Sequence, residues 1–218
     1  MARPVLNFPS VNLNEMHKEI LAWDLFKMLE NNAMYTLRDV PLCFGSIDEY
    51  LDIFEPLLLE ECRAQTLRNL HAATESDHHL ELAAVEANEP FRLLHFEMPQ
   101  QASRSSEDRA LFESRDLVFI SHEQLNLDEV DGEGNGQQEF HALGLVERIV
   151  ADRTASEGLL IVKVYLPEEP TSRLPPIQHK RLLQLRKVMI PASGAWYVRK
   201  LGNMVTINRE CQALQPET

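Results

Sequence analysis

Hydrophobic residues are most concentrated between Gly158 and Pro167, where Leu159–Val162 and Val164–Leu166 are interrupted only by Lys163. A run this short, with several β-branched residues, favours a β-strand over a helix. Because Lys163 is its only charged residue, we expect a central strand that is covered on both faces, as in a small closed barrel.

Other short stretches of alternating or apolar residues predict the neighbours of this strand. They are residues 80–87 and 91–96, joined as a hairpin, followed by 116–121, 140–151 and 195–207. Polar or glycine-bearing segments near 99–110 and 123–139 predict mobile loops. The basic segment around Leu182, Leu183 and Leu185 has no assigned form. Five or six short strands, mostly without helices of crossover length between them, predict a small antiparallel barrel.

Hydrophobic residues recur every three or four positions in two N-terminal segments. The first follows Asn12 and Glu15, which have capping-box spacing, and predicts a helix to about Asn31. Ser46 and Glu49 repeat this spacing before a longer helical segment that extends to about residue 73. Pro56 lies inside it and predicts a kink or a fresh helix start near residue 55.

The combined pattern predicts an α+β fold in which two helical arms carry a small antiparallel β-barrel. The expected divisions are an extended lead-in over 1–11, a helical region over 12–79, the barrel over 80–207 and the start of a second helical arm over 208–218.

Composition limits the class of protein. The chain has 44% hydrophobic and 25% charged residues, which is ordinary for a globular protein. It contains no apolar run of about 18 residues and no secretory leader, so we expect a soluble intracellular protein without a membrane partner. The three cysteines, at 43, 62 and 211, are widely separated, which favours reduced thiols over a disulfide framework or a zinc site.

Charge is distributed unevenly along the chain. The net charge is −13, yet the segment from Arg173 to Arg209 contains eight basic residues and no Asp or Glu. Arginine and lysine bind phosphates and exposed aromatic rings stack on bases, so this segment is a candidate surface for RNA or another single-stranded nucleic acid. The candidate residues are Lys180, Arg181, Arg186, Lys187, Tyr197, Arg199, Lys200 and Arg209.

Alternation along the last strand places Tyr197 and Arg199 on one face and Trp196, Val198 and Lys200 on the other. We expect Trp196 to lie in the core. For Tyr197, a core position and an exposed position that could stack on a base are equally favoured. An equal alternative for the whole basic segment is that it docks on an acidic surface of this chain or of a motor domain.

Motifs for chemistry are weak. ATP hydrolysis by a phosphate loop needs a glycine followed by Lys and then Ser or Thr, and no glycine in this chain is followed by Lys. His78 and His79 predict a surface pair, and Asp128-Glu129 a solvated loop. We therefore expect no catalytic residue, no bound metal and no cofactor in this chain.

Several blocks of sequence resemble the senataxin family of superfamily 1 RNA/DNA helicases, and residues 16–28 look most like its plant MAGATAMA-type members. The blocks are Tyr50–Gln65, His141–Gly144, Glu157–Tyr165, Trp196-Tyr197, Lys200–Gly202 and Thr206–Leu214.

The resemblance implies a helical brace and stalk with a β-barrel of the domain 1B type in a nuclear protein. The lack of a phosphate-loop motif departs from the family, so we expect no RecA-like domain in this chain. It further implies an accessory region that positions nucleic acid and supports RecA-like domains in cis or in trans during RNA processing or transcription termination. ATP and Mg²⁺ would belong to the full-length helicase. The alternative is a protein-interaction module that docks on a helicase core or self-associates, using an apolar face formed by Trp23, Phe26, Tyr50 and Phe54.

Overall fold

The protein, described here by a computed structural model, is built around a closed antiparallel barrel with the strand order β1-β2-β5-β4-β3-β6. The structure describes residues 13–30, 34–72, 77–99, 111–125, 140–151, 157–168, 176–190 and 194–214. The strands are β1 (His78–Asn88), β2 (Phe91–Pro99), β3 (Asp116–Ser121), β4 (His141–Ala151), β5 (Glu157–Tyr165) and β6 (Gly194–Asn203). The α+β class and the small antiparallel barrel are therefore confirmed.

Strand β5 has the central position expected of it, because it pairs with β2 on one side and β4 on the other. Leu160, Val162 and Val164 point into the barrel, where they join its interior cluster. Tyr165 lies on the opposite face and packs in a second cluster beneath the helices. The strand is thus buried on both faces, as its nearly unbroken hydrophobic run predicts.

The barrel interior is filled by side chains and leaves no room for a channel. A Cβ added to Gly144 of β4 would collide with Val162 and lie 3.1 Å from Cδ1 of Ile120. Trp196 of β6 is fully buried in the same interior, which confirms its predicted core position. The described interior of the barrel is therefore closely packed.

The first helical segment is divided in two, which corrects the prediction of one helix from residue 12 to residue 31. Helix α1 covers Leu13–Ala22 and helix α2 covers Leu25–Leu29. Asp24 between them has an extended backbone, and its carboxylate accepts a hydrogen bond from the amide of Phe26 at 3.1 Å. This side chain caps a new helix, and it therefore ends the first one.

The helical corner is buried rather than exposed. Trp23 is 2% exposed and Phe26 is 6% exposed, so the prediction that both contribute to an outer apolar face is wrong. Both belong to a cluster that also contains Phe119 and Leu143 from the outer wall of the barrel. The corner is one of the places where the helices pack against the barrel, alongside contacts of α3 with β6 and of α1 with β4.

Helix α3 runs continuously from Ile47 to Ala72. The predicted cap is confirmed, because the Glu49 amide donates to Oγ of Ser46 at 3.1 Å. No fresh helix starts at Pro56, which lies inside α3. The carbonyl of Asp52, which a proline at position 56 leaves without its helical donor, instead accepts a hydrogen bond from Arg38 at 3.0 Å.

Two further helices complete the fold. The basic segment without an assigned form is α4 (Pro176–Met189), and α5 (Val205–Ala213) begins earlier than the predicted position 208. The last strand accordingly ends at Asn203, whose side chain accepts from the amide of Val205 at 2.9 Å. The predicted features at residues 1–12, 100–110 and 126–139 lie outside the described residues.

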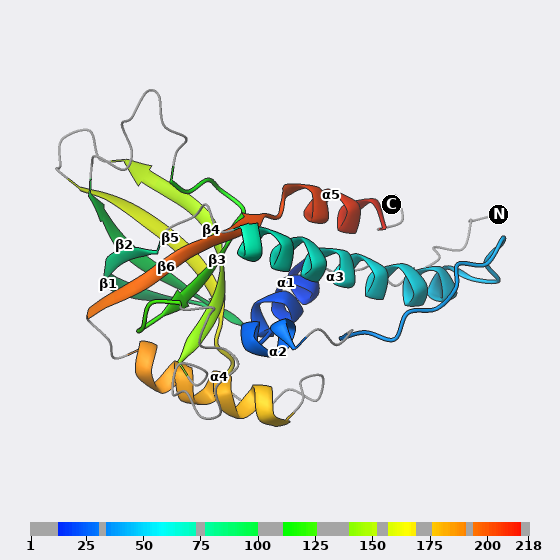
Figure 1. Ribbon diagram of the computed structural model, residues 1–218, viewed down its shortest axis with the longest axis horizontal. Helices are drawn as coiled ribbons and strands as arrows, with labels where there is room; N and C mark the ends of the chain where they lie inside the picture. Colours follow the sequence, from blue (N-terminus) through cyan, green and yellow to red (C-terminus); the bar gives the residue numbers. More distant parts are fainter. Residues whose placement is uncertain are drawn as a thin grey trace, which may run out of the picture.

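Figure 1 shows how these parts are arranged. Helix α3 extends away from the barrel, α5 runs beside it in the opposite direction, and α1 and α2 lie between α3 and the barrel wall. Helix α4 lies on the other side of the molecule and inserts Leu185 and Met189 into the interior cluster of the barrel. Within the described parts of the chain, no helix has the length and apolar character needed to cross a membrane.

Candidate nucleic-acid interface

The eight candidate residues are distributed over three elements. Lys180, Arg181, Arg186 and Lys187 lie on α4, Tyr197, Arg199 and Lys200 on β6, and Arg209 on α5. Helix α4 and helix α5 lie on opposite sides of the molecule (Figure 1). The eight candidate residues, which lie within thirty positions of one another in the sequence, therefore do not form one continuous surface.

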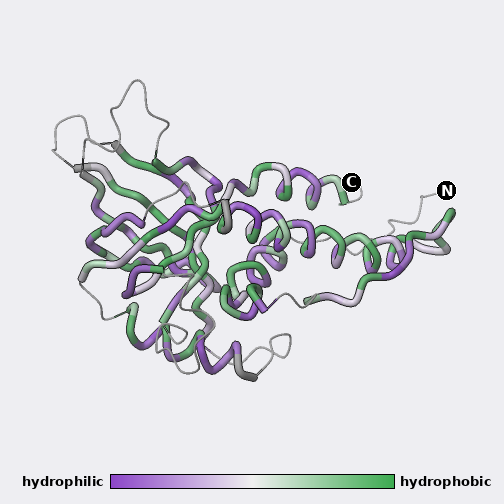
Figure 2. Tube along the Cα trace, in the orientation of Figure 1, coloured by the Kyte–Doolittle hydropathy of each residue, from purple (hydrophilic) through white to green (hydrophobic). Residues whose placement is uncertain are grey.

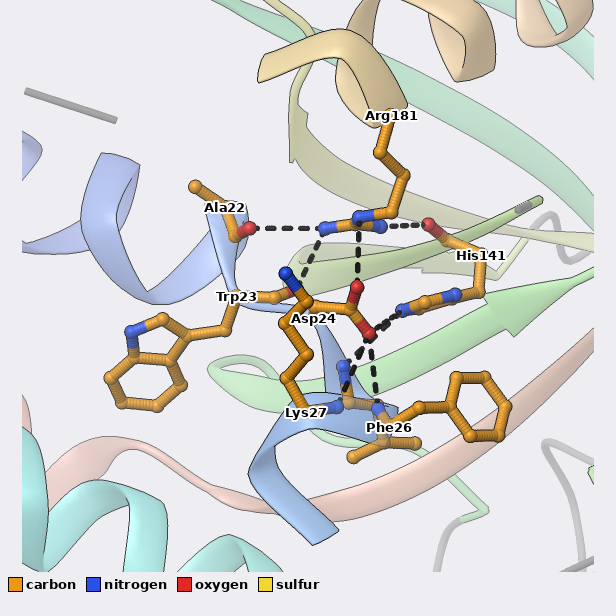
Figure 3. Close-up of polar contacts among 8 residues, drawn as sticks. Ala22, Trp23, Asp24, Phe26, Lys27, His141 and Arg181 are labelled. Carbon is orange, nitrogen blue, oxygen red and sulfur yellow. Dashed lines mark hydrogen bonds and ion pairs between the residues drawn. The ribbon is translucent and has the colours of Figure 1, made fainter. Parts of the chain in front are cut away.

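Arg181 is buried and is committed to internal contacts. One terminal nitrogen donates to the carbonyl of His141 at 2.6 Å, and the other donates to the carbonyls of Ala22 at 3.0 Å and Trp23 at 2.9 Å. Figure 3 shows the guanidinium lying between α4, the α1–α2 corner and β4. Arg181 thus fixes α4 to two other elements and does not face solvent.

Asp24 supplies the matching negative charge. Its Oδ2 lies 3.7 Å from Nε of Arg181, and its Oδ1 lies 3.4 Å from Nε2 of His141 (Figure 3). Burial alone would raise the pKa of Asp24, but the hydrogen bond to His141, the charge of that ring and the Arg181 guanidinium together hold the pKa below its ordinary value. The carboxylate is therefore ionised at neutral pH and balances the buried arginine.

Arg186 belongs to a second ionic network, separate from that of Arg181 and Asp24. It donates to the carbonyl of Leu166 at 2.8 Å and pairs with the carboxylate of Glu168. Arg92, which is 5% exposed, reaches the same carboxylate at 3.1 Å and also pairs with Glu89 at 2.5 Å. Glu168 thus bridges α4 and β2, and Arg186 is held within this network.

The two basic residues of β6 are paired as well. Nε of Arg199 lies 2.5 Å from Oδ1 of Asp77, and Nζ of Lys200 lies 2.9 Å from Oδ2 of Asp116. Asp116 is fully buried, and Lys200 lies where the pairing of β3 and β6 shifts register. These two cations neutralise buried or nearly buried carboxylates.

The remaining candidates are accessible. Lys180 and Lys187 are exposed on α4, and Arg209 is exposed on α5. Two residues seven positions apart lie on the same side of an α-helix, about two turns from each other, so the outer side of α4 presents two positive charges in a row. This pair is the part of the predicted set that is best placed to contact phosphates.

Tyr197 is partly buried on the outer wall of the barrel. Its ring lies 4.9 Å from the ring of His79, its register partner on β1, at an interplanar angle of 51°. Of the predicted surface pair, His79 is exposed, whereas His78 is partly buried and its ring lies 5.4 Å from that of Phe112. Sequence reasoning did not include His79, although alternation along β1 and β6 could have placed it beside Tyr197 once their pairing was known.

The accessible candidate residues are suited to binding an anionic or aromatic ligand. Within the described ranges, no three His, Cys, Asp or Glu side chains gather closely enough to hold a metal ion. The accessible groups are two lysines on α4, an arginine on α5 and a tyrosine–histidine pair on the barrel wall. Such groups can bind phosphates and stack on bases.

Comparison with known proteins gives two partial similarities, and no known family profile matches the chain. A stretch of 169 residues, 72% of the chain, is 26% identical to the probable helicase MAGATAMA 3 of Arabidopsis thaliana, of which it covers 18%. A stretch of 76 residues, 34% of the chain, is 33% identical to a probable helicase of Dictyostelium discoideum, of which it covers 8%. The chain is thus distantly similar to helicase-named proteins and spans less than a fifth of their length.

Proposed function

We propose that this chain is an accessory, non-motor region of a senataxin-like helicase and that it positions RNA or single-stranded nucleic acid beside RecA-like domains. ATP and Mg²⁺ are bound by those domains, in the same polypeptide or in another, and the setting is nuclear RNA processing or transcription termination. The observation that carries the proposal is the similarity to MAGATAMA 3, which includes most of this chain but only 18% of that protein.

The fold supports this role. The barrel is joined to its helices by a shared hydrophobic cluster and by the buried contacts of Arg181, so the two parts have a fixed relation. A fixed relation is what an accessory region needs if it is to hold a strand at a set place relative to a motor. The exposed Lys180 and Lys187 give this rigid body a basic edge.

The first test is direct binding of a labelled single-stranded RNA, measured by fluorescence anisotropy over a series of salt concentrations. We expect weak binding that decreases as salt rises, because the basic edge is small and the chain has a net charge of −13. Replacing both lysines (K180Q/K187Q) should lower affinity roughly threefold to tenfold and reduce the slope of log K against log salt by about 1.4.

A control variant removes the same charge elsewhere. Lys18→Gln with Arg68→Gln takes two cations from α1 and α3, where Lys18 pairs with Glu15 and Arg68 pairs with Glu61. This variant should bind RNA within about twofold of the original chain. Equal losses in both variants would show that only net charge matters, and the absence of salt-sensitive binding in the original chain would contradict the nucleic-acid role.

A further inference from the structure

An apolar groove lies where helix α5 ends against helix α3. It has a volume of about 360 Å³ and is open to solvent. Its apolar lining comes from both helices and consists of Phe54, Leu57, Leu58, Ala213 and Leu214. The nucleic-acid candidates Lys180, Lys187, Tyr197 and Arg209 are absent from its lining, so the groove is a separate surface from the proposed RNA contact.

The groove continues into the most apolar exposed part of the described chain. The rings of Phe54 and Tyr50 contact each other in a tilted arrangement with centroids 4.5 Å apart, and Phe44 contacts both rings. Four of the six large hydrophobic residues exposed in the described chain lie nearby: Leu37, Val40 and Leu42 in the segment before α3, and Ile47 at its first position. Figure 2 shows hydrophobic residues along this end of α3 and its preceding segment, interleaved with hydrophilic ones. Exposed apolar surface of this kind marks an interaction site.

The rim of the groove is acidic. Glu61 of α3 and Glu210 of α5 line it from the two sides. Helix α3 between Ile47 and Cys62 carries six acidic residues and no basic ones. Three of these six carboxylates are paired with arginines: Glu61 with Arg68 at 3.3 Å, Glu60 with Arg63 at 2.5 Å and Asp52 with Arg38 at 3.8 Å. Six carboxylates against three arginines leave this part of α3 with a net negative charge.

We propose that this groove binds an amphipathic helix whose apolar face is bordered by Lys and Arg. The two walls are themselves helices, and a third helix can lay its i, i+3, i+4 and i+7 side chains between them, as in a helical bundle. The basic border is required because Glu61 and Glu210 flank the apolar floor and would repel an acidic helix. This inference concerns a protein partner and is independent of the proposed nucleic-acid role.

The probe is a labelled synthetic helix with Leu at i, i+3, i+4 and i+7 and Lys on its polar face. A second peptide keeps the leucines and replaces every Lys by Glu. Fluorescence anisotropy with the full chain should show the basic peptide binding roughly tenfold or more tightly than the acidic one. Equal binding of the two peptides, or no binding of the basic peptide, would overturn the proposal.

Matched variants locate the site. Glu61→Gln with Glu210→Gln should weaken binding of the basic peptide roughly threefold to tenfold, because two rim charges are lost. Glu81→Gln with Glu123→Gln removes the same charge from exposed residues of β1 and the turn after β3, and should leave affinity within about twofold. Equal weakening by both pairs would mean that net charge, not the groove, attracts the peptide.

A gain-of-binding variant excludes loss of folding as the explanation. Ala213 is exposed in the lining of the groove, and Ala213→Glu adds a third carboxylate to it. Affinity for the basic peptide should rise about twofold to fivefold while circular dichroism stays unchanged. An unchanged or lower affinity in this variant, or self-association of the chain that the basic peptide fails to compete away, would contradict the assignment of the groove to a basic helix.

Discussion

At the scale of single residues, half of the eight basic residues in the segment 173–209 pair with carboxylates from other parts of the chain. Arg181, Arg186, Arg199 and Lys200 pair with Asp24, Glu168, Asp77 and Asp116, respectively. All four carboxylates lie outside the run of sequence that lacks acidic residues. A charge count along the chain therefore finds the cations but cannot show which of them are already paired, since the pairing depends on the tertiary fold.

His17 is a buried histidine whose ring contacts two other elements of the fold. Its Nε2 donates to Oδ1 of Asn208 at 3.0 Å, and its Nδ1 accepts from Nζ of Lys163 at 3.1 Å. Lys163 also pairs with Glu147 at 2.8 Å. The ring thus connects α1 to α5 and β5, and it fits this position in its neutral form.

We expect stability to depend on pH through His17. Burial lowers the pKa of His17, and the Lys163 ammonium lowers it further. Because the pKa is lower in the folded than in the unfolded state, the unfolded chain binds more protons below pH of about 6.5. The contribution of neutral His17 to the free energy of unfolding is complete above that pH. As pH falls from there toward the pKa of His17 in the folded state, the free energy of unfolding decreases by up to about 1.4 kcal/mol per pH unit. Urea denaturation from pH 7.5 to 5 would measure this loss.

The variant His17→Gln isolates the effect, because the other histidines titrate in both proteins and cancel in the difference. The free energy of unfolding of the variant should fall less steeply below pH of about 6.5 than that of the original chain. Identical pH profiles for the two proteins would show that His17 does not carry this dependence.

At the scale of elements, helix α3 contains a proline without being divided by it. Pro56 lacks the amide that would donate to the carbonyl of Asp52, and Arg38 donates to that carbonyl instead at 3.0 Å. Arg38 comes from the segment before the helix, so the compensation is not visible from the helix sequence. This is the physical reason why α3 continues through Pro56, although the proline rule predicts a kink or a fresh helix start near residue 55.

Replacing the proline should stabilise the helix. In Pro56→Ala an amide is restored opposite Asp52, and we expect the free energy of unfolding to rise by about 1–3 kcal/mol. Arg38→Ala should then cost less in the Pro56→Ala background than in the original chain, because Arg38 is no longer the sole donor to that carbonyl. Chemical denaturation of the four proteins in a double-mutant cycle would measure the coupling, and additive effects would contradict this account.

Elements whose residues form a clear pattern within their own sequence were predicted, whereas the division of the first helix depends on residues far away in the chain. The strands at 116–121 and 157–165 follow from their own hydrophobic pattern. The division at Asp24 depends on a polar pocket formed with Arg181 and His141, residues more than a hundred positions away. Helix α4 had a local indication, with Pro176 at its first position and Leu182, Leu185 and Met189 at helical spacing.

The candidate sites also differ in whether the sequence alone could identify them. The exposed Lys180 and Lys187 could be named from the sequence because lysine is rarely buried. The groove could not be predicted, since Leu214 and Phe54 meet only when α5 lies along α3. Sequence patterns therefore give the residue types available for binding, and the fold decides which of them share a surface.

At the scale of the whole molecule, the barrel wall separates two hydrophobic cores. Val118 of β3 and Val162 of β5 belong to the interior, while Phe119 of β3 and Leu143 of β4 pack outward beneath the helices. Each of these strands buries one face in the barrel interior and the other in the core beneath the helices. We infer that the helices and the barrel unfold together, because neither core can open without exposing a face of shared strands.

The two tryptophans of the chain allow this cooperativity to be measured. Trp23 lies in the core beneath the helices and Trp196 lies in the barrel, so each ring reports on one core. In Trp196→Phe only Trp23 fluoresces, and in Trp23→Phe only Trp196 does. In each variant the fluorescence transition in urea should coincide with the far-ultraviolet circular dichroism transition of the same protein. If Trp23 fluorescence changed at lower urea than the dichroism of Trp196→Phe, the helices would detach while the barrel persisted, and the fixed relation required of the accessory region would be lost.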